Sequence, residues 1–306
     1  MSVELMNTKE VASYLDIHEK QVYALIKSGR IPATRATGKW IFPKKIIDEW
    51  IESQAGAGLH EARQKGARIE GALLAAGSND PILDMLLTTL KSSHPDFYIF
   101  TASTGSTDGL KALGRGYTDV AWSHLLDPAS GLYNTPAVLS PYLEQLKGVA
   151  VHLFNRELGL LVLKGNPLHI LGFDDVIGRK PRIVNRQSGA GTRILLDHYL
   201  QKAGLAAEVL PGYDLEVFTH MEVGLAILSG EADTGIASAA VARLLGLDFI
   251  PLTTESFDMI LAQATFFVKG VQAFLEGLQS EIFQKKVDKL GGYDFKHAGR
   301  VLHAVC

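Results

Sequence analysis

Apolar residues recur at helical spacing in two short segments near the N-terminus. Asn7 and Glu10 can form a capping box, and the first segment continues with Val11, Tyr14 and Leu15. A second helix is predicted over residues 18–28 and ends at Gly29. Its apolar face is formed by Val22, Leu25 and Ile26. Two short helices joined by about three residues describe a helix-turn-helix, whose second helix can enter the major groove of DNA.

A hairpin and a third helix follow this pair. Residues 30–42 predict a hairpin-like wing that turns at Thr37 and Gly38, and Pro43 opens a helix. The residues that this helix is expected to bury are Ile46, Ile47, Trp50 and Ile51. We therefore expect a winged helix-turn-helix DNA-binding domain over residues 1–54.

From residue 69 onward, strand-like apolar runs alternate with helical segments. Strands are predicted over residues 72–76, 97–102, 119–122, 182–185 and 233–237, and helices over residues 81–92, 107–115, 191–203 and 221–229. This alternation is typical of βαβ units in a parallel sheet. Two long apolar stretches, 149–163 and 249–264, predict crossovers between two lobes. We expect an α/β ligand-binding domain over residues 69–306, with lobe 1 at about 69–150 and 262–306 and lobe 2 at about 151–261.

Residues 55–68 lose the hydrophobic periodicity and are polar and charged, so they are predicted to be a linker. The alternative is a helix that continues through this stretch and pairs with its copy in a dimer.

Small polar residues stand where the predicted strands end and the helices begin. In an open α/β sheet, ligands bind outside the carboxyl ends of the strands, and helix N-termini offer free N–H groups to anions. We therefore expect a small anionic ligand at these positions. The candidate ligand-binding residues are Ser78, Asn79, Ser103, Thr104, Ser106, His124, Ser188, Ala190, Gly191, Thr192, Arg193, His220, Met221 and Ser238.

Composition and charge narrow the possible functions. A chain of 306 residues exceeds what one hydrophobic core usually organises, and the 47% hydrophobic and 21% charged residues are ordinary globular proportions. The net charge of −3 leaves room for nucleic-acid binding only through a local basic cluster. The single cysteine, Cys306, cannot form an intrachain disulfide. We expect a cytoplasmic protein, because the start lacks a secretory signal and no apolar run approaches the ~20 residues of a membrane span.

The local basic cluster lies in the second predicted helix and the wing. No Asp or Glu occurs between Lys20 and Lys45, and phosphate contacts need such a one-signed surface. We expect promoter DNA to be contacted by Lys20, Gln21, Tyr23, Lys27, Arg30, Arg35 and Lys39. Because helix-turn-helix proteins usually bind two half-sites, we also expect a homodimer.

The N-terminal segment resembles the excisionase-type, MerR-like winged helix-turn-helix family. The motifs that carry this resemblance are Thr8-Lys9-Glu10-Val11-Ala12, Val22-Tyr23-Ala24-Leu25-Ile26, Gly29-Arg30-Ile31-Pro32-Ala33 and Gly38-Lys39-Trp40. The resemblance covers about 50 residues and implies DNA binding.

Residues 70–260 resemble the type II periplasmic binding-protein superfamily, and in particular molybdate-binding domains fused to helix-turn-helix regulators. The motifs are Ala75-Ala76-Gly77-Ser78, Thr104-Gly105-Ser106, Gly116-Tyr117-Thr118-Asp119-Val120-Ala121, residues 185–193, Thr219-His220 and residues 230–237. The resemblance implies a one-component transcription regulator that senses molybdate or tungstate. In the molybdate-binding relatives, hydroxyls and backbone N–H groups hold the anion without a cationic side chain. The residues that would correspond are Ser78 and Ser106 from one lobe, and Ala190, Gly191, Thr192 and the turn at His220 and Met221 from the other.

Other functions remain open at this point. Arg186 and Arg193 could clamp a carboxylate, which keeps small organic acids as alternative ligands, or could pair with nearby acids such as Asp197. An enzyme on the same lobed fold is a weaker alternative, because no serine elbow or metal-ligand spacing occurs. We expect no cofactor, no bound metal and no catalytic residue.

Overall fold

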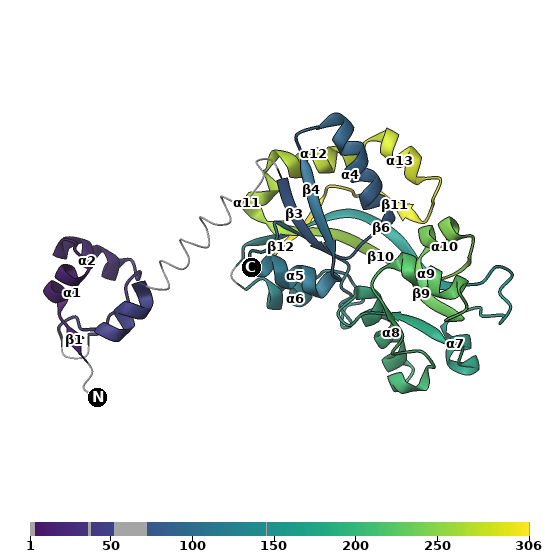
Figure 1. Ribbon diagram of the computed structural model, residues 1–306, viewed down its shortest axis with the longest axis horizontal. Helices are drawn as coiled ribbons and strands as arrows, with labels where there is room; N and C mark the ends of the chain where they lie inside the picture. The colour runs from purple at the N-terminus through teal and green to yellow at the C-terminus, as the bar shows by residue number, and fades with distance from the viewer. Residues whose placement is uncertain (1–3, 36–37, 52–71, 145, 306) are drawn as a thin grey trace. The chain divides into compact units, whose positions relative to one another are not determined.

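The computed structural model of the chain describes residues 4–35, 38–51, 72–144 and 146–305 (Figure 1). Contacts between Cα atoms divide the chain into two compact units, Met1–Glu70 and Gly71–Cys306. The predicted linker (residues 55–68), together with Ala36 and Thr37 of the predicted wing, lies outside the described residues.

The N-terminal unit contains the predicted helix pair. Helix α1 spans Thr8–Tyr14, helix α2 spans Glu19–Lys27, and residues 44–51 are also helical. The predicted capping box is confirmed, because Asn7 Oδ1 accepts from Glu10 N at 3.0 Å and Glu10 Oε2 accepts from Asn7 N at 2.7 Å. The core of this unit consists of Met6, Val11, Ala12, Val22, Ile31, Phe42 and Ile47.

The wing differs in part from the expectation. Among the described residues of the range 30–42, strand pairing consists of one bridge between Thr34 and Ile41. Phe42 and Pro43 instead form strand β2 (Phe42–Pro43), which pairs antiparallel with β1 (Leu5–Met6), a strand that the sequence analysis missed. The third helix therefore starts after Pro43. Ile47 is fully buried as expected, whereas Ile46 and Ile51 are exposed, so the expected burial of those two residues is wrong.

The second unit is built on one mixed sheet of ten strands, and the predicted α/β fold is confirmed (Figure 1). The strand order is β4-β3-β5-β10-β6-β9-β7-β8, with β11 and β12 also paired to β6. The strands are β3 (Ala72–Gly77), β4 (Tyr98–Ser103), β5 (Val120–Ser123), β6 (Gly148–Val162), β7 (Ile183–Arg186), β8 (Glu216–Val217), β9 (Thr234–Ser238), β10 (Asp248–Ala262), β11 (Tyr293–Asp294) and β12 (Val301–Val305).

Helices cover both faces of this sheet in each lobe. They are α4 (Pro81–Ser93), α5 (Ser106–Gly114), α6 (Pro136–Leu139), α7 (Phe173–Arg179), α8 (Gly191–Lys202), α9 (His220–Leu228), α10 (Ala239–Leu245), α11 (Gln263–Phe266), α12 (Lys269–Gln279) and α13 (Glu281–Val287). Two 3₁₀ turns are also present, Ser140–Tyr142 and Ala207–Val209. In lobe 1, α4, α12 and α13 bury one sheet face, while α5 and α6 bury the other. In lobe 2, α7 and α8 face α9 and α10 across the sheet.

The two predicted crossovers are the long strands β6 and β10, which join the lobes. They pair antiparallel along nearly their whole length. One end of β10 pairs with β5 of lobe 1, and one end of β6 pairs with β9 of lobe 2. The middle of this two-stranded ribbon therefore lies between the lobes, where its side chains can meet residues of both.

Candidate functional site

Strand ends and helix starts from both lobes meet at one place, which we call the lobe junction (residues 77–80, 104–107, 123–124, 186–193, 219–221 and 238). The two lobes touch here, because Thr107 N of lobe 1 donates to Gly189 O of lobe 2 at 3.2 Å. Gly191, the first residue of α8, lies against His124. A Cβ atom on Gly191 would lie 2.6 Å from the His124 ring, so only glycine fits this approach.

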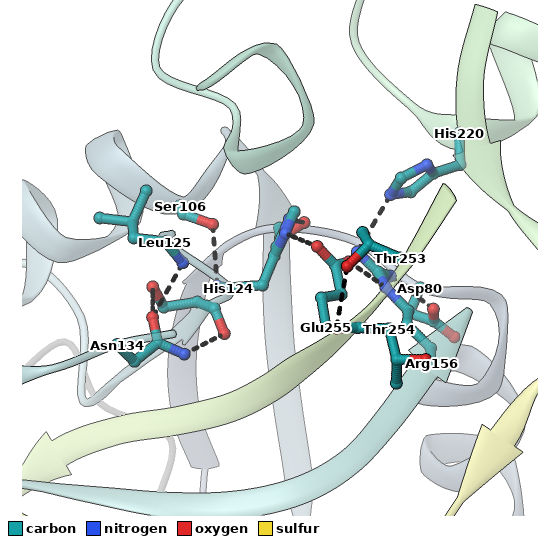
Figure 2. A network of polar contacts seen from close by, with 12 residues as sticks. Asp80, Ser106, His124, Leu125, Asn134, Arg156, His220, Thr253, Thr254 and Glu255 are labelled. Atoms are coloured by element: carbon teal, nitrogen blue, oxygen red, sulfur yellow. Dashed lines mark hydrogen bonds and ion pairs between the residues drawn. The ribbon is translucent and has the colours of Figure 1, made fainter. Parts of the chain in front are cut away.

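A chain of buried hydrogen bonds runs through the lobe junction (Figure 2). Ser78 Oγ lies 2.7 Å from His124 Nε2, and His124 Nδ1 lies 2.7 Å from Glu255 Oε2. Arg156 Nε donates to the other oxygen of Glu255 at 2.6 Å, and Arg156 Nη1 donates to Asp80 Oδ2 at 2.5 Å. All five side chains are almost fully buried, so these hydrogen bonds, including the three to carboxylates, form away from bulk water.

The paired charges in this chain stabilise one another. Burial opposes the charge on Arg156, but Glu255 and Asp80 outweigh it and raise the pKa of the guanidinium. Burial likewise opposes the charge on Glu255, but His124 and Arg156 lower the pKa of this carboxyl. Burial lowers the pKa of His124 despite its contact with Glu255, with Arg156 and Arg186 also disfavouring a further positive charge. Arg156 and Glu255 are therefore charged, while His124 is neutral.

His220 presents a free N–H group at the lobe junction. Arg156 Nη2 lies 3.1 Å from His220 Nε2, and a guanidinium can only donate, so Nε2 is the accepting nitrogen of the ring. Burial, followed by the charges of Arg156 and Arg186, holds the pKa of His220 well below its ordinary value, so the ring is neutral. Its proton therefore sits on Nδ1, which is buried and has no hydrogen-bond partner among the described residues.

Arg186 is a buried cation that forms no ion pair with any of the described residues. Its side chain is 2% exposed. Nη2 donates to Phe218 O at 2.7 Å and Nε to Gln187 Oε1 at 3.3 Å, whereas Nη1 has no partner among the described residues. Burial, with Arg156 as the second cause, lowers the pKa of Arg186 to about 10. An isolated buried charge is unfavourable, so this guanidinium is suited to an anion.

Unpaired polar atoms concentrate at the lobe junction. Six of the eight buried side-chain atoms that lack a hydrogen-bond partner within the described part of the chain belong to it: Asn79 Oδ1, Arg186 Nη1, Gln187 Nε2, Thr192 Oγ1, His220 Nδ1 and Ser238 Oγ. Folded proteins pair nearly all their buried polar groups, so this concentration points to a ligand. Three of the six atoms are nitrogens that can only donate in the states assigned above, and two are hydroxyls, which favours a ligand rich in acceptors.

The structure brings together most of the ligand-binding residues predicted from the sequence. Ser78, Asn79, Ser106, His124, Ala190, Gly191, Thr192, His220 and Ser238 all lie at the lobe junction, and all but Asn79 are buried. Ser106 Oγ accepts from His124 N at 3.2 Å, which leaves the hydroxyl hydrogen of Ser106 free to donate. Ala190 N already donates to Gln187 O at 3.1 Å.

Other predicted residues lie at the margin. Ser103 and Ser188 are exposed, and Thr104 and Met221 are half-buried. Arg193 already has protein partners: its guanidinium donates to Glu216 Oε1 at 3.0 Å and to Tyr213 Oη at 3.1 Å. Arg193 also lies 3.6 Å from Asp197, in agreement with the alternative of a structural ion pair. Ligand binding stays a prediction for these five residues, as it does for the nine residues at the lobe junction.

The sequence analysis missed Asp80, Arg156, Gln187 and Glu255, and it left Arg186 only as an alternative. A signal was present for two of them, because Arg156 and Glu255 are charged residues inside the two apolar crossover stretches. The sheet register places them directly opposite one another on β6 and β10. The expectation from the resemblance, an anion held without a cationic side chain, contrasts with the two buried arginines found here.

All the predicted DNA-binding residues are exposed to solvent. Val22 is buried and fixes α2 to the core of the N-terminal unit, while Lys20, Gln21, Tyr23 and Lys27 on the same helix are exposed. Arg30, Arg35 and Lys39 are exposed as well. Arg35 Nε donates to Gly38 O at 3.0 Å, and its guanidinium lies 5.6 Å from the Trp40 ring centre. These contacts hold Arg35 beside Gly38 and Trp40.

Comparisons with known proteins extend these observations. Residues 87–279 match the family described as PBP superfamily domain, and residues 5–55 match the family described as helix-turn-helix domain. A Bacillus subtilis (strain 168) protein, YvgK, is 29% identical over 305 residues, which cover 96% of each chain. Among the described residues, no helix combines the length and apolar composition that crossing a bilayer requires.

Solved structures share the fold of the chain at low sequence identity. A putative phosphate ABC transporter substrate-binding protein from Clostridium perfringens aligns with a TM-score of 0.57 and 16% identity, over 75% of this chain and 99% of the other. A tungstate ABC transporter structure from Geobacter sulfurreducens aligns with a TM-score of 0.52 and 12% identity, over 72% and 100%. A mutant of Corynebacterium glutamicum OxyR aligns with a TM-score of 0.52 and 14% identity, over 93% and 89%.

This pairing of domains points to a regulator or binding protein, and specifically suggests a ligand-sensing regulator that binds DNA. The family model covers well over half of the chain and includes the lobe junction apart from residues 77–80. The chain therefore belongs to the PBP superfamily, with a helix-turn-helix domain at its N-terminus.

Proposed function

We propose that this protein is a transcription regulator that binds promoter DNA through residues 1–54 and senses a small oxyanion at the lobe junction. The observation that carries the proposal is the buried guanidinium of Arg186, whose Nη1 is one of six buried polar atoms at the lobe junction that have no hydrogen-bond partner among the described residues. A bound anion would supply the missing acceptors and the missing counter-charge in one step.

Molybdate and tungstate are our first candidates, followed by phosphate. The support is the donor-rich chemistry of the lobe junction, together with the fold that the chain shares with a phosphate and a tungstate transport protein. In this proposal Arg186, Thr192 and His220 hold the anion from lobe 2, and Ser78 and Ser106 hold it from lobe 1. Small organic acids remain the alternative ligand class, because a guanidinium also pairs with a carboxylate.

Ligand and DNA binding are linked through the lobes in this proposal. A ligand that contacts both lobes binds the closed arrangement more tightly than an open one. It can shift the equilibrium between the two arrangements only by this difference in its affinity for them. We further propose that the protein is a cytoplasmic homodimer that binds two half-sites in promoter DNA. The geometry of this dimer changes when the two lobes close.

The test is a thermal-shift and calorimetric titration of the full chain with molybdate, tungstate, phosphate, sulfate and small carboxylates. A ligand that binds only the folded state raises the melting temperature. Arg186→Gln should lower affinity by about ten- to a hundredfold, because one charge-assisted hydrogen bond is lost. Arg179→Gln is the matched control, since Arg179 is an exposed residue of α7 paired with Asp175. Equal affinity of Arg186→Gln and the control would remove the lobe junction as the site.

A hydrolase is the second candidate, and it rests on one arrangement. Ser78, His124 and Glu255 have the order and spacing of a nucleophile, a base and an orienting acid. Arg156 counts against this candidate, because it already neutralises Glu255 and so weakens the support for an imidazolium on His124. Turnover of p-nitrophenyl acetate by the wild type and its loss in Ser78→Ala would favour the hydrolase over the sensor.

A further inference from the structure

The hydrogen bonds that link Ser78, His124 and Glu255 use every polar side-chain hydrogen that these residues carry. None is left to donate to an anion that has no hydrogen of its own. Both oxygens of Glu255 accept charge-assisted hydrogen bonds, one from Arg156 and one from His124 Nδ1. A carboxylate only accepts, so Nδ1 must carry a hydrogen. In a neutral ring Nε2 then has only a lone pair, and the partner at 2.7 Å, Ser78 Oγ, must be the donor.

This assignment changes what Ser78 offers to a ligand. Its only hydroxyl hydrogen points to His124, and its backbone N–H donates to Trp122 O at 3.0 Å. Towards the lobe junction Ser78 therefore presents lone pairs alone. Molybdate, tungstate and sulfate at neutral pH also present lone pairs alone, so their oxygen would meet the Ser78 oxygen without a hydrogen between them.

We infer, on the basis of the function proposed above, that the lobe junction distinguishes oxyanions by the proton they carry. A fully deprotonated anion binds together with one proton from solvent, which His124 takes up at Nε2. Nε2–H then donates to Ser78, and the Ser78 hydroxyl turns to the anion. A hydrogen phosphate dianion supplies its own hydrogen to Ser78 and binds without this uptake. No covalent bond to the anion forms or breaks in either case.

The charges that face His124 support this coupling. Glu255 on β10 favours its protonation, while Arg156 on β6 and Arg186 on β7 oppose it, and the neutral His220 on α9 lies with its ring centre 6.4 Å away. Asp80, Glu255, Arg156 and Arg186 together carry no net formal charge. A dianion of either kind adds negative charge beside these groups, which favours a proton on His124. The anion also offsets the positive charge of Arg186, which otherwise opposes the protonation of His124. The hydrogen-bond requirement of Ser78, and not this charge, separates a fully deprotonated anion from hydrogen phosphate.

Calorimetric titration of the full chain in two buffers with different ionisation enthalpies measures the number of protons taken up. At mildly alkaline pH inorganic phosphate is mainly hydrogen phosphate, while molybdate is fully deprotonated. We expect about one proton per molybdate and about none per phosphate, and a molybdate affinity that falls about tenfold for each pH unit while phosphate affinity stays nearly constant. Equal proton numbers and equal pH profiles for the two anions would overturn the inference.

Two variants assign the proton to a residue. His124→Asn should abolish the uptake that accompanies molybdate, and the control His169→Asn, at an exposed turn where φ is +49°, should retain it. Uptake that persists in His124→Asn overturns the inference. If His124→Asn does not fold, the pH profiles of the wild type still decide. If none of molybdate, phosphate and sulfate shifts the melting temperature, the proposed function itself is wrong, which is a different result from binding without proton uptake.

Discussion

Arg156 and Arg186 are both buried arginines of the same sheet, yet their surroundings are opposite. Arg156 forms ion pairs with Asp80 and Glu255, and its pKa is raised. Arg186 has no carboxylate partner within the described residues, and its pKa is lowered to about 10. A paired buried charge belongs to the fold, since removing one partner leaves another charge buried alone. An unpaired buried charge weakens the fold, so its presence points to a task outside folding.

The strongest test of this comparison is Arg156→Gln. The substitution leaves two buried carboxylates without a cation, so we expect the free energy of unfolding to fall by about 3–5 kcal/mol. Urea denaturation of the ligand-free full chain measures this loss. Arg179→Gln is the control and should change stability by less than about 1 kcal/mol, because its ion pair with Asp175 is at the surface. Similar losses for both variants would contradict the structural role of Arg156.

Arg186→Gln should separate binding from stability. We expect the affinity for the anion to fall by about 1.5–3 kcal/mol, while the stability of the ligand-free chain stays the same or rises. The reason is that glutamine removes an uncompensated buried charge and keeps a hydrogen-bonding end. Calorimetry and urea denaturation on one preparation measure both quantities. A large loss of ligand-free stability would show that Arg186 serves the fold, as Arg156 does.

The two histidines at the lobe junction predict acid sensitivity of the ligand-free protein. Burial is the main cause that lowers the pKa of both His124 and His220. As pH falls below their ordinary pKa of about 6.5, the unfolded chain takes up protons that the folded chain does not. The free energy of unfolding should therefore be highest above this pH and decline below it. A urea midpoint that is the same at neutral and mildly acidic pH would contradict the prediction, and His220→Asn should flatten the decline.

Exposed cations of the N-terminal unit should affect stability least. Lys39→Gln should leave the free energy of unfolding within about 0.5 kcal/mol, because the side chain is exposed. It should weaken binding to all DNA sequences and reduce the slope of log affinity against log salt by about 0.9, the contribution of one phosphate contact. Fluorescence anisotropy over a salt series measures this slope. An unchanged slope would exclude Lys39 from the DNA interface.

The sequence predicted more of the fold than of the candidate site. Helices α1 and α2, the two crossovers, and the strands and helices that were predicted for the two lobes lie where apolar periodicity placed them, within about two residues. Other elements of the second unit were not predicted, namely α6, α7, α10, α11, α12, α13, β8, β11 and β12. Strand β1 was missed because two residues are too few for a periodic pattern. Most of the hydroxyl and histidine residues of the lobe junction were found, because they follow strands and precede helices.

The charged part of the site required the tertiary structure. Arg156 and Glu255 are 99 residues apart in the chain, and only the antiparallel register of β6 and β10 sets them opposite one another. The isolation of Arg186 is likewise a property of its neighbours, which come from several distant segments. Elements follow from local backbone geometry and side-chain periodicity, both of which are written in consecutive residues. Whether a buried charge is paired depends on which distant strands and helices pack against it, and no local pattern records that.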